Sequence, residues 1–175
     1  EKCHGGNHWL ENIISLIISS LQFDSIKSEE IYEYAIISLK DELDSQILKD
    51  GGHQERSASY HILLLDRLTE MAILIEYFKK ERPFWLIKKI HLMVAWVEIA
   101  SLETGKMPRF NDSPCNLYDS KKDILNFAKS FLEKDIRELS PIRKNLIELI
   151  FKNEINNFSK RYLTIDKKLG ITVLK

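Results

Sequence analysis

Apolar residues recur along most of this chain at intervals of three and four, and polar residues occupy the positions between them. This spacing gathers the apolar side chains of each stretch on one face of an α-helix. The pattern predicts helices over residues 8–23, 28–48, 58–81, 84–103, 120–134 and 140–159. The core stripe of the third helix would consist of Leu65, Leu68, Met71, Ala72, Ile75 and Phe78. That of the second would consist of Ile31, Tyr34, Ala35, Leu39, Leu43 and Ile47.

The breaks between these helices carry residues that end or begin helices. Pro83 lies just before the fourth expected helix, and Pro141 suits the first turn of the sixth. Residues 105–114, Gly-Lys-Met-Pro-Arg-Phe-Asn-Asp-Ser-Pro, form a long irregular connection, and long ordered loops in helical domains are often functional. Serial helical hairpins with mostly short connections favour an all-α toroid or solenoid over a four-helix bundle.

The last residues follow a different pattern. Residues 162–165 and 171–174 have the composition of two short strands on either side of Gly170. A lone hairpin is only marginally stable in water, and the chain begins at Glu1 without a methionine. We therefore expect the 175 residues to be a piece of a longer protein, so that no targeting signal can be read from them.

Composition and charge narrow the classes of partner. The length of 175 residues suits one domain or a large part of one. The 26 basic and 26 acidic residues balance, so no overall field attracts nucleic acid or an anionic membrane, and we expect neither as a partner. Cys3 and Cys115 are too few for a disulfide framework, and no apolar run approaches the roughly 20 residues of a membrane span. An anionic ligand would have to be met by a local cluster of charge.

The densest cluster is the segment 50–61, Asp-Gly-Gly-His-Gln-Glu-Arg-Ser-Ala-Ser-Tyr-His. The pair Gly51-Gly52 allows positive φ or a close approach to a ligand. Ser57 would cap the third helix and place Tyr60 and His61 in its first turn, where free backbone N–H groups favour anions. A purely structural interpretation is a capped helix with a solvated Glu-Arg pair and a packed tyrosine. The side chains that it leaves unexplained are His53, Glu55, Arg56 and His61. The segment therefore indicates a site rather than a linker.

A second cluster lies at residues 5–12, Gly-Gly-Asn-His-Trp-Leu-Glu-Asn. If the first helix begins near Asn7, the polar side chains are three or four positions apart and project together from its first turns. These side chains are Asn7, His8, Glu11 and Asn12. The alternative is that Asn7 is the helix N-cap and His8 lies on the surface. Spacing alone leaves both interpretations open.

A third cluster, residues 109–113, lies in the long connection and reads Arg-Phe-Asn-Asp-Ser. Asn and Ser are common turn formers, so by itself this segment indicates a turn. A metal site is a poorer explanation of the chain's polar residues. Cys3, His4 and His8 are crowded and lack a second pair at a zinc-finger spacing, and we expect no metal.

Taken together, the three segments resemble the heparinase II/III-like polysaccharide lyases in motif, order and spacing. The resemblance rests on Gly-Asn-His-Trp-Leu-Glu-Asn at 6–12, Asp-Gly-Gly-His-Gln-Glu-Arg-Ser-x-x-Tyr-His at 50–61 and Phe-Asn-Asp-Ser at 110–113. It implies an incomplete α/α toroid of antiparallel helical hairpins followed by an antiparallel β-sandwich. Residues 1–160 would be the C-terminal part of the toroid, and residues 161–175 would begin the sandwich.

The family reaction is β-elimination at a uronic acid, which cleaves the bond at C4, leaves an unsaturated sugar and needs no cofactor. The resemblance implies that Asn7, helped by His8, neutralises the sugar carboxylate. Tyr60 would protonate the departing O4 and, for some stereochemistries, also remove the C5 proton. A tyrosine with a pKa of about 10 serves readily as an acid, and positive charge on Arg56, or on His61 if protonated, would ease phenolate formation. The residues assigned to substrate binding are Glu11, Asn12, His53, Glu55, Arg56, His61 and Asn111.

Two departures from the family pattern bear on these expectations. Ala58 stands where members often carry proline, which affects only the rigidity of the helix start. Members also draw a second catalytic histidine from the sandwich domain, so we expect this piece alone to be inactive and the parent protein to be a lyase.

The expected substrate is an acidic polysaccharide or oligosaccharide, with heparan sulfate, alginate and bacterial exopolysaccharides all open, and the expected location is periplasmic or secreted. The alternatives are a toroid that binds carbohydrate without catalysis, and a helical scaffold for protein partners.

Overall fold

The computed structural model describes residues 6–79, 81–101, 107, 111, 121–135 and 137–151. These residues form six helices and no strand, so the all-α prediction is confirmed for them. Every helix coincides with a predicted one, with ends shifted by a few residues. The helices are α1 (Asn7–Ser20), α2 (Ile26–Gln46), α3 (Ala58–Lys79), α4 (Phe84–Ala100), α5 (Lys121–Glu133) and α6 (Pro141–Phe151). The predicted continuation of the sixth helix to 159 and both predicted strands lie outside the described residues.

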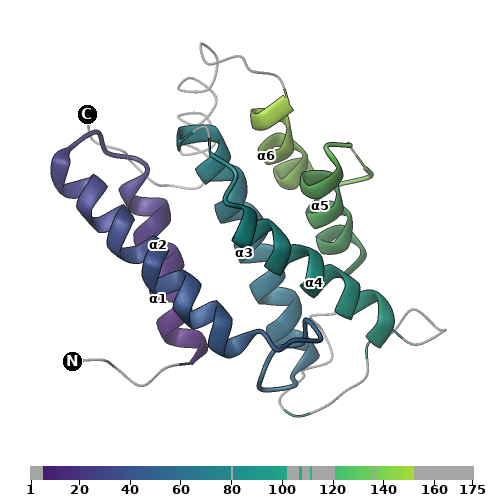
Figure 1. Cartoon of the computed structure of the whole chain (residues 1–175). Helices are drawn as coiled ribbons and strands as arrows, with labels where there is room; N and C mark the ends of the chain where they lie inside the picture. The colour runs from purple at the N-terminus through teal and green to yellow at the C-terminus, as the bar shows by residue number, and fades with distance from the viewer. Residues whose placement is uncertain are drawn as a thin grey trace.

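The helices pack as three consecutive hairpins, α1 with α2, α3 with α4, and α5 with α6. Beyond the hairpins, α1 contacts α3, α3 contacts α5, and α2 contacts α4. In Figure 1, α2 and α4 lie in front of α1 and α3, and α1 and α3 both begin at the lower end of the molecule. The segment that joins α2 to α3 lies at that same end.

The central helix of the bundle is α3, which contacts α1, α4, α5 and α6. It is buried on every side from Met71 to Ile75, because these five consecutive residues are each at most 2 % exposed. The predicted stripe is confirmed at Leu65, Leu68, Met71, Ala72 and Ile75, whereas Phe78 is 38 % exposed near the end of the helix. The predicted site lies toward the opposite end of α3, in its first turn.

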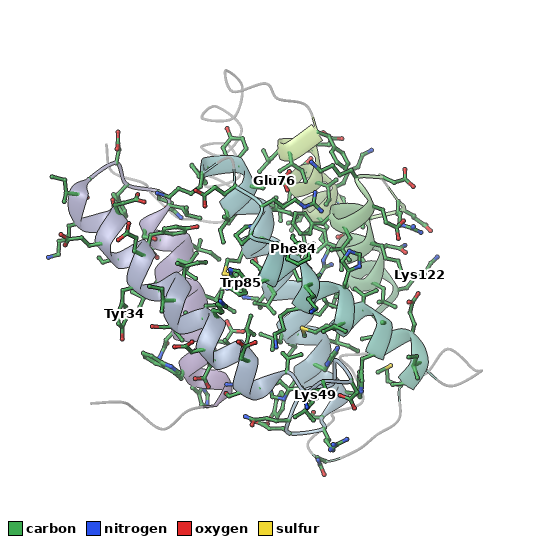
Figure 2. The ribbon with its side chains drawn as sticks, viewed as in Figure 1. Tyr34, Lys49, Glu76, Phe84, Trp85 and Lys122 are labelled. Atoms are coloured by element: carbon green, nitrogen blue, oxygen red, sulfur yellow. The ribbon has the colours of Figure 1, made fainter. Side chains whose placement is uncertain are left out.

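The predicted core stripe of α2 is wrong at Tyr34, and Ile31 is only half-buried. Ala35, Leu39 and Leu43 are buried as expected, but Tyr34 is 60 % exposed and Tyr32 is buried in its place. Figure 2 shows Tyr34 pointing away from the bundle. Tyr32 packs at the start of α2, where the Lys79 ammonium at the end of α3 lies 4.7 Å from the centre of its ring. Contact with a second helix, which spacing along α2 does not reveal, decides between the two tyrosines.

Ion pairs join the helices across their packing faces. Arg67 of α3 contacts Glu11 of α1 at 3.4 Å, and Lys89 of α4 contacts Asp44 of α2 at 2.9 Å. The Arg143 guanidinium of α6 binds both carboxylate oxygens of Asp66 on α3, at 3.0 and 2.8 Å, and also contacts Asp123 on α5. These pairs fix the relative positions of helices that are distant in sequence.

Candidate functional site

The loop between α2 and α3 is anchored to the end of α2 through His53. The buried His53 ring accepts the Glu55 backbone N–H at Nδ1 (3.3 Å), so its proton is on Nε2. Nε2 then donates to the buried Gln46 Oε1 at 3.0 Å, and the Gln46 amide donates to Glu42 at 2.6 Å. Burial lowers the pKa of His53, although nearby Glu55 partly opposes this. A neutral His53 therefore ties the loop to α2.

The two glycines of this loop press against α4. Gly51 has φ +88°, and a Cβ there would lie 2.2 Å from the Leu92 carbonyl oxygen. A Cβ on Gly52 would lie 2.6 Å from the Trp96 indole nitrogen. The positive φ predicted for this pair is confirmed at Gly51. The close approach, however, is to α4, so packing within the protein already accounts for the absence of side chains.

The start of α3 follows the prediction closely. Ser57 precedes the helix, and its hydroxyl accepts the Tyr60 backbone N–H at 3.4 Å, a long N-cap hydrogen bond. Tyr60 is half-buried in the first turn, and His61 beside it is fully buried. The His61 Nε2 donates to the Met93 carbonyl of α4 at 3.0 Å, and its ring lies 4.5 Å from that of Trp96.

Burial decides the charge of His61. It lowers the pKa of this ring to about 4, although the hydrogen bond to the Met93 carbonyl favours the protonated form. With Nε2 donating, Nδ1 is an acceptor that has no partner in the described structure. His61 is therefore neutral near pH 7 and supplies no positive charge to Tyr60. The condition attached to His61, that it be protonated, is therefore not met near pH 7, and of the two cations considered Arg56 remains.

Arg56 and Asn111 share an unusual backbone conformation at the rim of the loop. Arg56 has φ +51° and Asn111 has φ +50°, a region that non-glycine residues rarely adopt, and both side chains are exposed. The Asn111 amide donates to the Glu55 backbone carbonyl at 2.6 Å. This contact brings a residue of the third motif against the second, across 56 positions of sequence.

The first motif lies on the opening turns of α1, as the prediction assumed. Gly6, with φ 142°, is the N-cap, so the alternative that Asn7 caps the helix is wrong. The backbone of Asn7 begins the helix, and its side chain lies outside what the structure describes. His8 and Asn12 are exposed. Glu11 is half-buried and bound to Arg67, which is held in turn by Glu70 at 2.6 Å.

The structure therefore places the described residues of the three motifs toward one end of the bundle. The link from Glu11 to Arg67 aligns the parallel helices α1 and α3, and both begin at the end of the bundle where the loop lies (Figure 1). Sequence reasoning missed the side chains that hold this arrangement from other helices. These are Gln46 of α2, Arg67 of α3 and Trp96 of α4. The sequence offered two signals for them: a glutamine near the end of a predicted helix, and a tryptophan within a mostly apolar helix.

Other features of the described residues do not compete with this site. No group of three or more His, Cys, Asp or Glu side chains there is placed to hold a metal ion. No helix among them is long and apolar enough to cross a bilayer. A cavity of about 450 Å³ is lined by Tyr32, Ile36, Glu81, Arg82, Pro83 and Trp85. It lies at the first half of α2 and the start of α4, away from the loop that Lys49 marks in Figure 2.

Comparison with known proteins supplies the family. No curated protein and no solved structure matches the chain significantly. The family model described as heparinase II/III N-terminus matches residues 2–137, which include all three motifs and most of the described helices. That the segment is the last part of this N-terminal domain stays a prediction. A match over this much of the chain shows that it belongs to the heparinase II/III family of polysaccharide lyases.

Proposed function

We propose that the protein to which this chain belongs is a lyase that cleaves uronic-acid-containing polysaccharides by β-elimination. The observation that carries the proposal is the presentation of Tyr60. It lies in the first turn of a capped helix, half-buried, beside a loop that is tied to α2, to α4 and to Asn111. Such fixed presentation suits a proton donor, because general acid catalysis depends on position before pKa.

The proposed reaction assigns one task to each motif. Asn7, with His8, hydrogen-bonds the uronate carboxylate, which makes the C5 proton removable. A base takes that proton, the electron pair forms the C4–C5 double bond, and the C4–O4 bond breaks. Tyr60 donates its phenolic proton to the departing O4. Because His61 is neutral near pH 7, we assign Tyr60 the acid role and expect the base to come from elsewhere in the parent protein.

Polar groups of the three motifs provide the proposed substrate contacts. Arg56 offers a cation and Asn111 an amide at the rim of the loop, while Glu11 and Asn12 project from α1. Glu55, half-buried in the loop, keeps the binding role proposed from the sequence. His53 and His61 are buried, so we propose that they serve the substrate indirectly, by fixing the loop.

The toroid remains the proposed architecture of the whole domain. It is supported by the serial hairpins and by the contacts of α1 with α3, α3 with α5, and α2 with α4, which place alternate helices side by side. We also propose a periplasmic or secreted location, which cell fractionation of the source organism would test.

The experiment that tests the function is ultraviolet absorbance of the parent protein with a panel of uronate polysaccharides. The conjugated double bond formed by elimination would make the absorbance rise with one polymer class. Tyr60→Phe should reduce this rise by about 100-fold or more, since it removes a general acid but keeps the ring. Tyr34→Phe is the matched control, because Tyr34 is 60 % exposed on α2 and belongs to no motif.

If the parent protein gives a flat trace across the panel but still binds one polymer, the proposal of a lyase fails and that of a carbohydrate-binding toroid takes its place. Equal activity of Tyr60→Phe and the parent protein would remove Tyr60 from the mechanism. The chain of 175 residues alone is expected to give a flat trace.

A further inference from the structure

The second half of α4 contacts the loop of the second motif at several independent points. Gly51 lies against the Leu92 carbonyl, Gly52 against the Trp96 indole, and His61 against both the Met93 carbonyl and the Trp96 ring. Trp96 is the one side chain of α4 among these contacts that meets both ends of the motif, at Gly52 and at His61.

From this arrangement we infer that Trp96 is a positioning residue of the catalytic site, through which α4 sets the place of Tyr60. The inference rests on the proposed role of Tyr60 as the acid. Trp96 is half-buried, and its contacts with the motif are to Gly52 and His61, so we infer that it acts through the backbone of residues 51–61.

The geometry explains why a side chain smaller than tryptophan would not hold the loop in the same position. The loop backbone at Gly52 has no side chain of its own to fill the space beside α4, so the indole defines how closely the loop approaches. The indole also packs on His61, the residue after Tyr60, with the two rings inclined by 34°. Removing part of the indole leaves space into which both ends of the motif can shift, and displacement of a catalytic group by about 1 Å can cost up to 100-fold in rate.

The chain offers a matched control on the same helix. Trp85 is also half-buried and packed against the hydrophobic core, but it lines the cavity beside Tyr32, well away from the loop (Figure 2). Trp85→Phe and Trp96→Phe therefore remove the same atoms from the same helix, and they differ in what the indole contacts.

The test measures two quantities in the full-length parent protein and both variants. The first is hydrogen–deuterium exchange over residues 48–61, which requires no activity. Trp96→Phe should speed exchange in this segment by about tenfold or more, and Trp85→Phe should leave it unchanged, since local opening reflects local packing. Equal exchange in the two variants would overturn the inference.

The second quantity is turnover. Trp96→Phe should lower kcat by about tenfold with a smaller change in KM, because a displaced acid weakens the transition state more than substrate binding. A rise in KM alone, with kcat unchanged, would also overturn the inference, because it would make Trp96 a residue that contacts the substrate. If the parent protein has no lyase activity while exchange still separates the variants, the proposed function fails and the structural link between α4 and the loop stands.

Discussion

At the scale of single residues, burial gives the two histidines of the loop motif a structural role in place of the substrate contacts that the sequence suggests. His53 and His61 lie beside an arginine and a tyrosine in the sequence, as substrate ligands would. In the structure both are buried and neutral near pH 7, and each uses Nε2 to bind another helix. Their shared function is to fasten the loop, and this costs the protein stability in acid.

The low pKa of His61 gives a testable dependence of stability on pH. The folded pKa of about 4 lies below the ordinary value of 6.5, so between these values the unfolded chain binds a proton that the folded chain does not. Stability should therefore fall as the pH drops through this window, by about 2 kcal/mol between pH 7 and pH 5 from this residue. Urea unfolding of the chain and of His61→Gln should show the smaller loss for the variant. Parallel losses in both would contradict the prediction.

Single residues also show where sequence reasoning succeeds and where it stops. The cap at Ser57 was predictable because an N-cap needs only its own helix. That Tyr32 rather than Tyr34 lies in the core was not predictable. Both positions suit the apolar stripe of α2, and only contact with other elements decides which one is buried. The burial of His61 depends on α4, which follows it by more than 20 residues, so the sequence around His61 does not predict it.

At the scale of elements, the helices were predictable and the fit of the loop against them was not. Each predicted helix is present in the described residues because its apolar period is long and regular. The glycine pair was correctly expected to allow positive φ or a close approach. That the approach is to Leu92 and Trp96 follows from how α4 folds back along α3, which spacing does not encode.

Gly51→Ala tests this fit. The new methyl group would meet the Leu92 carbonyl oxygen at 2.2 Å, and alanine is strained at φ +88°. We expect a loss of about 2 kcal/mol or more in the free energy of unfolding, or displacement of the loop seen as lost protection of residues 48–61. Lys49→Ala, an exposed residue of the same loop, should change stability by less than about 0.5 kcal/mol. A Gly51→Ala variant as stable and protected as the Lys49→Ala variant would refute the close packing.

At the scale of the whole molecule, charged side chains join helices that are distant in sequence. The most connected is Arg143, which binds Asp66 of α3 and Asp123 of α5 from its place on α6. Asp123 also accepts the Ser140 backbone N–H at 2.9 Å, at the start of α6. The three side chains are 20–26 % exposed, so solvent screens them less than a surface pair.

Arg143→Met is expected to destabilise the chain by about 2 kcal/mol, because it keeps the packed stem but leaves two half-buried carboxylates without their cation. Lys122→Met is the control. Its pair with Glu138 is about 80 % exposed on both sides, and the loss should be below about 1 kcal/mol. Chemical denaturation measures both. Similar losses for the two variants would show that the Arg143 cluster is no stronger than a surface pair.

The burial of Met71 to Ile75 on α3 bears on which rearrangements of this domain would preserve its stability. In a helical array, stability depends on the interfaces between adjacent hairpins as well as on each hairpin itself. Here Met71 to Ile75 form one continuous interior shared by α3 and the helices around it. A boundary drawn between α2 and α3 would cut through that interior. Deletions, permutations and grafts that leave it whole are therefore the ones that this architecture tolerates.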